Sequence, residues 1–219
     1  MEHGIGKLVL GDKPLTISEV FQFIEFEPFI DVSEIALERV REARAFLERE
    51  FEKGALIYGV NTGFGKLAHE RISESDINAL QLNLIRSHAS GVGAPLPRGV
   101  VKLAMLLLLN SLAKGFSGVR VEVVEHLQSL LNLDFVPVVP SIGSLGASGD
   151  LAPLSAIALA LIGEGEVYTR GEPGFGISHE NGWEILPAIE VLNRFGVAPL
   201  TLHAKEGLSL INSTAITQS

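Results

Sequence analysis

The residues whose types and order most clearly allow a chemical reaction are Ala147, Ser148 and Gly149, at the centre of the small-residue stretch Gly143–Ser155. If the Gly149 amide nitrogen attacks the Ala147 carbonyl carbon, a five-membered ring closes. Loss of water from this ring, and then of the Ser148 hydroxyl, leaves a methylidene group conjugated to an imidazolone. Glycine suits the attacking position because it has no Cβ and tolerates unusual backbone angles. The tripeptide therefore predicts an electrophile made from the chain itself.

Asp150 follows the tripeptide and is expected to begin a helix, as an acidic N-cap with Pro153 in the first turn. The unpaired N–H groups and the positive dipole end of this helix would favour negative charge developing on the ring. Two other interpretations exist. The stretch could be a small-residue turn before a buried helix, or Ser148 could be the nucleophile of a serine hydrolase. The Gly-x-Ser-x-Gly pattern of such hydrolases fails, because Asp150 stands where the second glycine is needed.

Three further segments carry residues that could act on a substrate. Tyr58–Gly65 contains three glycines, which allow a tight path that can close over a ligand and exclude water. Ser87–Gly93 contains His88 at an expected helix end, where histidine more often has a structural role than a catalytic one. Lys205–Asn212 ends in Asn212, whose side chain amide could bind a carboxylate. None of the three would be specific alone.

Together the four segments resemble the aromatic amino acid ammonia-lyases, a family with a self-made methylidene-imidazolone (MIO) group. The resemblance implies that MIO forms from the tripeptide Ala-Ser-Gly and that no metal or external cofactor is needed. It implies that Asp150 assists ring formation, by positioning or acid–base help. By the same resemblance, the catalytic residues are Tyr58, Ala147, Ser148, Gly149 and Asp150, with Tyr58 as the base, and the substrate-binding residues are His88 and Asn212.

The segment around His88 bears on the choice of substrate. Histidine-selective members of the family carry a Ser-His-Ala sequence here, whereas phenylalanine-selective members have apolar residues. The resemblance therefore implies non-oxidative elimination of ammonia from L-histidine to trans-urocanate, a reaction of histidine catabolism. Tyrosine-selective members can also carry histidine at this place. Tyrosine or phenylalanine ammonia-lyase and aminomutase activities remain alternatives.

Family members are considerably longer, and their remaining residues form a long helical bundle. The resemblance therefore implies that this chain is the N-terminal half of the fold, with a homotetramer formed by the full-length protein. A second tyrosine, an arginine and a late carboxylate of the family's site would lie in the other half. A non-catalytic truncated fragment is thus a further alternative, and we expect the short chain to be inactive alone. Ser213 replaces the glycine that usually follows the asparagine equivalent to Asn212.

Composition restricts the partners and location. The chain has 219 residues, a formal net charge of −9 and a pI near 5.2, which argue against nucleic acid and anionic membranes as partners. Hydrophobic residues make up 47% and charged residues 20%, which predicts a folded protein. The absence of cysteine excludes disulfides and thiolate chemistry. No basic segment followed by an apolar core begins the sequence, so we expect a cytoplasmic protein acting on a small amino acid.

The elements that must position these residues are expected to be mostly helical. The predicted fold is mainly α, with a small mixed α/β region at residues 1–95 that carries the loop of Tyr58, and a helical domain at residues 96–219 that carries the MIO precursor. Leu103–Leu109 and Leu151–Ile162 are predicted to be buried helices, because both are too short to span a bilayer.

The remaining pattern predicts a hairpin over Leu8–Thr16, a strand at Ala55–Tyr58 and a second hairpin over Glu164–Phe175. Helices are expected over Thr16–Ile24, with a capping box, and over Ser33–Gly54, Ser73–Ala89, Arg98–Lys114, Val119–Leu131, Ile185–Phe195 and from His203 onward.

Overall fold

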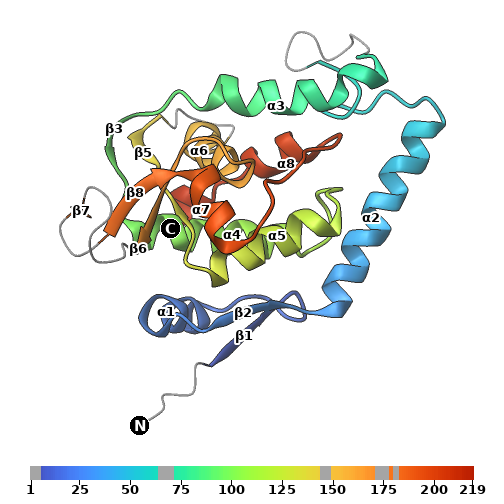
Figure 1. Cartoon of the computed structure of the whole chain (residues 1–219). Helices are drawn as coiled ribbons and strands as arrows, with labels where there is room; N and C mark the ends of the chain where they lie inside the picture. Colours follow the sequence, from blue (N-terminus) through green and yellow to red (C-terminus); the bar gives the residue numbers. More distant parts are fainter. Residues whose placement is uncertain (1–5, 64–71, 144–148, 171–177, 180–182) are drawn as a thin grey trace.

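The computed structural model describes residues 6–63, 72–143, 149–170, 178–179 and 183–219. Its centre is formed by three helices: α4 (Arg98–Leu112), α5 (Val121–Asn132) and α6 (Leu151–Leu161). Helix α3 (Ile77–His88) lies along one side and the N-terminal elements lie along the opposite side (Figure 1). Their apolar side chains belong to one continuous core. The two long apolar runs are buried helices, and the predicted mainly α fold class is confirmed.

The N-terminal region is a β-α-β unit. Strand β1 (Lys7–Leu10) pairs in parallel with β2 (Phe29–Val32), and α1 (Ile17–Phe26) connects them. The predicted hairpin over Leu8–Thr16 is therefore wrong. The partner strand lies after the helix, because its alternating Ile30 and Val32 bury the same sheet face as the apolar residues of β1.

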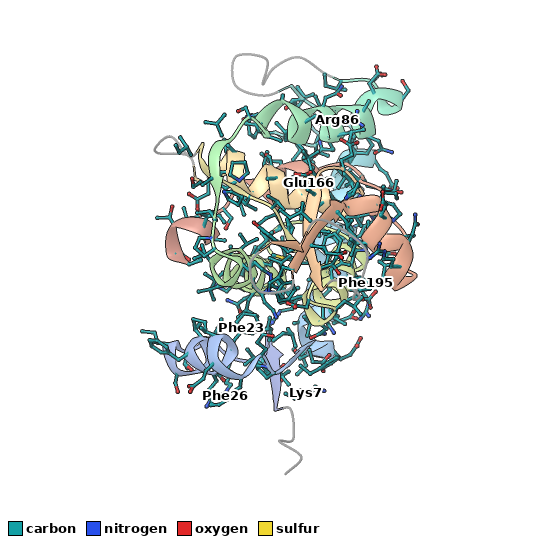
Figure 2. The ribbon with its side chains drawn as sticks, turned by 60° about the vertical axis from the view of Figure 1, so that its left-hand side comes forward. Lys7, Phe23, Phe26, Arg86, Glu166 and Phe195 are labelled. Atoms are coloured by element: carbon teal, nitrogen blue, oxygen red, sulfur yellow. The ribbon has the colours of Figure 1, made fainter. Side chains whose placement is uncertain are left out.

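Helix α1 begins as the sequence predicts. Thr16 and Glu19 form both hydrogen bonds of a capping box. Phe23 is buried on the side of the helix that faces the protein body, whereas Phe26 lies on its outer side (Figure 2). Helix α2 (Glu34–Glu52), with Ser33 as N-cap, then runs from the β1–β2 sheet toward the beginning of α3 (Figure 1).

Residues 55–57 are irregular and 58–61 form a turn, instead of the strand expected at Ala55–Tyr58. The side chain of Asn61 takes the backbone groups that a neighbouring strand would need: its Oδ1 accepts from Ile57 N at 2.8 Å, and its Nδ2 donates to Ala55 O at 2.7 Å. After residues outside the described ranges, a 3₁₀ turn, η2 (Glu74–Asp76), leads into α3 (Ile77–His88).

Two small sheets join sequence-distant segments. Strand β3 (Val92–Pro95) pairs with β5 (Pro140–Ile142), so the end of the predicted N-terminal region is paired with the segment before the MIO precursor. The second sheet has the order β4-β6-β8-β7. Its strands are β4 (Val136–Pro137), β6 (Glu166–Arg170), β7 (Ser178–His179) and β8 (Trp183–Pro187).

The predicted hairpin over Glu164–Phe175 is only partly right. Its first half is β6, but β6 pairs with β8, and residues 171–175 lie outside the described residues. Helix α7 (Ala188–Phe195) consequently begins three residues later than predicted, because 185–187 belong to β8. The chain ends with α8 (Glu206–Ile211) and α9 (Ala215–Gln218), the latter packed against α4 and α6. In the part of the chain that the structure describes, no helix is long and apolar enough to cross a membrane.

Candidate active site

Gly149 and Asp150 are held against the chain that follows Asn212. The Asp150 amide donates to the Ser213 carbonyl at 2.8 Å. Gly149 has φ +106°, and a Cβ at this position would lie 2.7 Å from the same carbonyl oxygen. Only glycine fits both the backbone angle and the close approach. Ala147 and Ser148, the other two residues of the predicted ring, lie outside the described residues.

The Asp150 carboxylate also reaches this C-terminal segment. Its Oδ2 accepts from the Thr217 amide at 2.8 Å, and its Oδ1 accepts from the Thr217 hydroxyl at 2.6 Å. Asp150 occupies the N-cap position of α6, as predicted, but its side chain makes no capping hydrogen bond. The expected acidic cap is therefore wrong in its contacts. The buried carboxylate ties the beginning of α6 to α9 instead.

Glycines bring the segment after His88 against the segment that leads to the MIO precursor. A Cβ on Gly91 would lie 3.2 Å from Cβ of Pro140. A Cβ on Gly143 would lie 3.0 Å from both Gly91 Cα and Ala152 Cβ. Two of the four sequence segments are thus in close backbone contact, near the first turn of α6.

His88 is the last residue of α3, and one of its ring nitrogens is occupied. Its Nδ1 lies 2.8 Å from the Leu84 carbonyl oxygen and 3.1 Å from Ser87 Oγ. Because a carbonyl oxygen can only accept, Nδ1 carries a hydrogen and donates it. In the neutral ring, Nε2 then presents its lone pair as an acceptor. The partly exposed His88 ring can therefore bind a donor group of a ligand.

Tyr58 stands in the turn at the beginning of the glycine loop. The Val60 amide donates to the Ile57 carbonyl at 3.0 Å, so Tyr58 and Gly59 are the two central residues of this turn. Gly59 has φ +71°, the left-handed angle that a type II turn requires at its third residue. The Tyr58 side chain is half exposed.

Asn212 lies at the C-terminal end of α8, and its exposed side chain follows the last helical turn. The beginning of that helix is fixed by Glu206, which is fully buried. Glu206 Oε1 accepts from Arg120 Nε at 2.8 Å, and its Oε2 accepts from the His203 amide at 2.7 Å. The hydrogen bond to Glu206 raises the pKa of Arg120, whereas burial lowers the pKa of the neighbouring Lys205.

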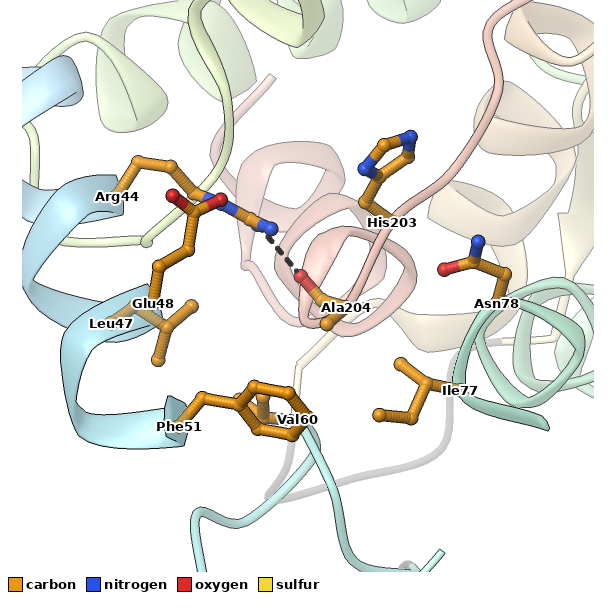
Figure 3. A pocket seen from close by; sticks show the side chains of 9 residues that line it. All are labelled: Arg44, Leu47, Glu48, Phe51, Val60, Ile77, Asn78, His203 and Ala204. Atoms are coloured by element: carbon orange, nitrogen blue, oxygen red, sulfur yellow. Dashed lines mark hydrogen bonds and ion pairs between the residues drawn. The ribbon is translucent and has the colours of Figure 1, made fainter. Parts of the chain in front are cut away.

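A cavity of about 240 Å³ lies between α2, the turn after Tyr58 and the segment before α8 (Figure 3). Arg44 borders it and donates to the Ala204 carbonyl at 2.9 Å. Phe51 and Val60 supply apolar walls. Among the described residues, its lining contains none that the sequence predicts to bind or transform a substrate.

The structure therefore connects the four sequence segments, while the roles of their residues stay predictions. Sequence reasoning missed Gln81, whose Nε2 donates to the Gly59 carbonyl and whose Oε1 accepts from the Leu208 amide, and Thr217, which donates to Asp150. A signal existed for Gln81, because it lies four residues after Ile77 and four before Ile85, on the buried face of α3. Within the described residues, no group of three or more His, Cys, Asp or Glu side chains is arranged to hold a metal ion.

Comparisons with known proteins give a consistent result. The family described as "Aromatic amino acid lyase" matches residues 15–219. The histidine ammonia-lyase of Geobacillus thermodenitrificans (strain NG80-2) is 49% identical over 208 residues, which cover 94% of this chain and 39% of that relative. This chain thus spans well under half the length of that curated relative.

Solved structures show the same partial coverage. Tyrosine aminomutase from Streptomyces globisporus matches with a TM-score of 0.83 and 34% identity, over 95% of this chain and 37% of that chain. Histidine ammonia-lyase from Trypanosoma cruzi matches with a TM-score of 0.81 and 36% identity, over 96% of this chain and 38% of that chain. The described fold corresponds to a part of each of these larger enzymes.

Proposed function

Because this chain belongs to the aromatic amino acid lyase family, we propose that the whole protein eliminates ammonia from L-histidine to give trans-urocanate, as in histidine catabolism. The observation that carries the proposal is the contact between three of the four segments: Gly143 lies against Gly91, Gly149 and Asp150 lie against Ser213, and His88 ends the helix α3 that leads to Gly91. The 49% identity to a histidine ammonia-lyase supports histidine as the substrate.

The residues described here fit an MIO group made from Ala147, Ser148 and Gly149. Gly149 adopts the left-handed angle and lies against the Ser213 backbone, where any Cβ would collide. Such external support is what a strained, compressed loop requires. When formed, MIO supplies an electrophile for the substrate amine and makes the nitrogen a better leaving group. Asp150 serves by holding the ring-forming loop to α9, and we propose no metal or external cofactor.

The remaining roles follow from the chemistry of each side chain. Tyr58 is the base that removes the β-hydrogen of the substrate. His88 offers Nε2 to the imidazole N–H of histidine, since its Nδ1 is committed to Leu84. Asn212 orients the substrate carboxylate through its amide. Holding such groups in place together can be worth about 7–11 kcal/mol of the barrier.

Since the chain covers 39% of its histidine ammonia-lyase relative, we propose that it has little or no activity alone. The packing that compresses the MIO loop would come partly from the rest of the fold, so Ala147–Gly149 stays uncyclised in the short chain. Intact-mass measurement tests this directly. A 219-residue chain lighter by the mass of two water molecules, with added ultraviolet absorbance, would contradict it.

We propose that the full-length protein is a cytoplasmic homotetramer, with residues 1–95 and 96–219 as two parts of each subunit. Exposed apolar side chains on one side of α1, among them Ile17, Phe21 and Ile24, support a role for this side in subunit or domain contacts. We expect the short chain to be a monomer or a smaller oligomer. Light scattering that finds a stable tetramer of the short chain would overturn this, and cell fractionation tests the location.

The substrate is tested by incubating the protein, as its gene encodes it, with histidine, tyrosine and phenylalanine separately. Absorbance of each conjugated acid reports elimination, and ammonia release confirms it. Histidine should have the highest kcat/KM. The similarity to tyrosine aminomutase makes aminomutase activity the second candidate, which would appear as a β-amino acid product from tyrosine. Preference for tyrosine or phenylalanine over histidine would refute our first choice.

A further inference from the structure

The backbone of the turn at residues 57–61 helps to fix the position of Tyr58. The turn is closed by the Val60 amide and is braced by both ends of the Asn61 side chain amide. The Asn61 carbonyl also accepts from the Ile72 amide at 2.9 Å, which ties the turn to the segment before α3. These contacts shape the turn, but none of them connects it to the helix that carries Asn212.

Gln81 makes that connection. Its side chain is fully buried on α3, and its Nε2 donates to the Gly59 carbonyl at 3.2 Å. Its Oε1 accepts from the Leu208 amide, in the first turns of α8, at 3.3 Å. One carboxamide therefore joins the peptide that follows Tyr58 to the helix that ends at Asn212.

The backbone packing around Gln81 leaves little freedom for this bridge. A Cβ on Gly207 would lie 2.7 Å from the Gln81 carbonyl oxygen and 3.1 Å from its Cα. Helices α3 and α8 thus touch through backbone atoms at the same place. An amide is suited to the bridge because it supplies a donor and an acceptor at once. An apolar side chain of the same length would leave Gly59 O and Leu208 N without these partners.

We propose that Gln81 is a positioning residue of the elimination reaction, which fixes the Tyr58 turn relative to Asn212 without touching the substrate. This inference rests on the proposed function for its catalytic meaning. The structural part of the proposal is independent of that function: loss of the Gln81 carboxamide makes the turn at residues 57–61 and the beginning of α8 more mobile.

The structural content is tested by amide hydrogen exchange on the 219-residue chain. We compare Gln81→Met with Asn83→Met, a matched control that removes an exposed carboxamide from the same helix. Gln81→Met should speed exchange in 57–61 and at Leu208 about tenfold, which corresponds to the loss of one buried hydrogen bond. Asn83→Met should leave both unchanged. Unchanged exchange in Gln81→Met would overturn the proposal.

The effect of Gln81 on catalysis is tested in the protein as its gene encodes it. Gln81→Met should lower kcat on histidine about tenfold or more with a smaller change in KM, because the Tyr58 turn loses this brace whereas α8 keeps the Glu206 bonds to Arg120 and His203. In a Tyr58→Phe background the same substitution should cause almost no further loss. A purely structural role would lower activity equally in both backgrounds, and that result would overturn the proposal.

Gln81→Glu, which has nearly the same shape, provides a rescue. Its carboxyl can donate to Gly59 O only when protonated, so its kcat relative to the parent should rise as pH falls. A pH-independent ratio would also count against the bridge. If the parent protein releases no ammonia from any aromatic amino acid, the proposed function fails, and the exchange experiment still decides whether Gln81 holds the turn. Should Gln81→Met fail to fold, Gln81→Glu is compared with the parent in the same exchange measurement.

Discussion

Replacing Asp150 should destabilise the short chain even if the MIO group never forms. Its carboxylate is 1% exposed and accepts two hydrogen bonds from Thr217, at 2.8 and 2.6 Å. Hydrogen bonds to a charged group contribute about 1.5–3 kcal/mol each, but the Thr217 groups regain water when the carboxylate is lost. We therefore expect Asp150→Ala to lower the free energy of unfolding by about 2–3 kcal/mol, in part by releasing α9 from α6.

Two companion variants separate hydrogen bonding from charge. Asp150→Asn keeps an acceptor for the Thr217 amide and gains a donor for its hydroxyl oxygen, so it should cost less than about 1 kcal/mol. Thr217→Val removes the hydroxyl alone and should cost about 1.5 kcal/mol, because the buried carboxylate loses the hydrogen bond from this hydroxyl. Urea unfolding of the four proteins measures these values. Equal destabilisation by Asp150→Asn and Asp150→Ala would refute the reasoning, since charge and not hydrogen bonding would then dominate.

Three further results are expected. The Lys13 and capping-box contacts lower the pKa of Glu19 from 4.5 to about 2. The contribution of its carboxylate to the free energy of unfolding is therefore complete above pH 4.5 and is lost as pH falls toward 2. Glu19→Gln should not show this acid-dependent loss of stability, which urea unfolding across that pH range measures. Glu206→Ala should cost about 3–5 kcal/mol because the partly buried Arg120 loses its carboxylate partner and is left with the Thr201 carbonyl, and a calorimetric transition that does not move would disprove this. In the full-length protein, His88→Leu should lower the ratio of kcat/KM for histidine to kcat/KM for phenylalanine about tenfold. An unchanged ratio would show that His88 is not part of the substrate site.

Local sequence patterns were enough to predict most helices of this protein. The Thr16–Glu19 capping box, the Ser33 N-cap and the apolar runs of α4 and α6 each depend on residues within one or two helical turns. Interactions over such short distances along the chain can be predicted from the sequence itself. The strands were less predictable, because a strand is stable only with a partner, and β1 and β6 pair with segments beyond the nearest turn.

The ability of Ala147–Gly149 to form a ring was also predicted from the sequence alone, since ring closure depends on three successive residue types. How that tripeptide is supported was decided by the tertiary structure. Asp150 was expected to cap its own helix, but the fold brings Thr217 within reach, and the carboxylate bonds to it instead. Likewise nothing local to Gly59 or Leu208 predicts that Gln81 bonds to both. A buried carboxylate or amide must find its partners wherever the packed chain offers them, and only the folded arrangement of distant segments determines which they are.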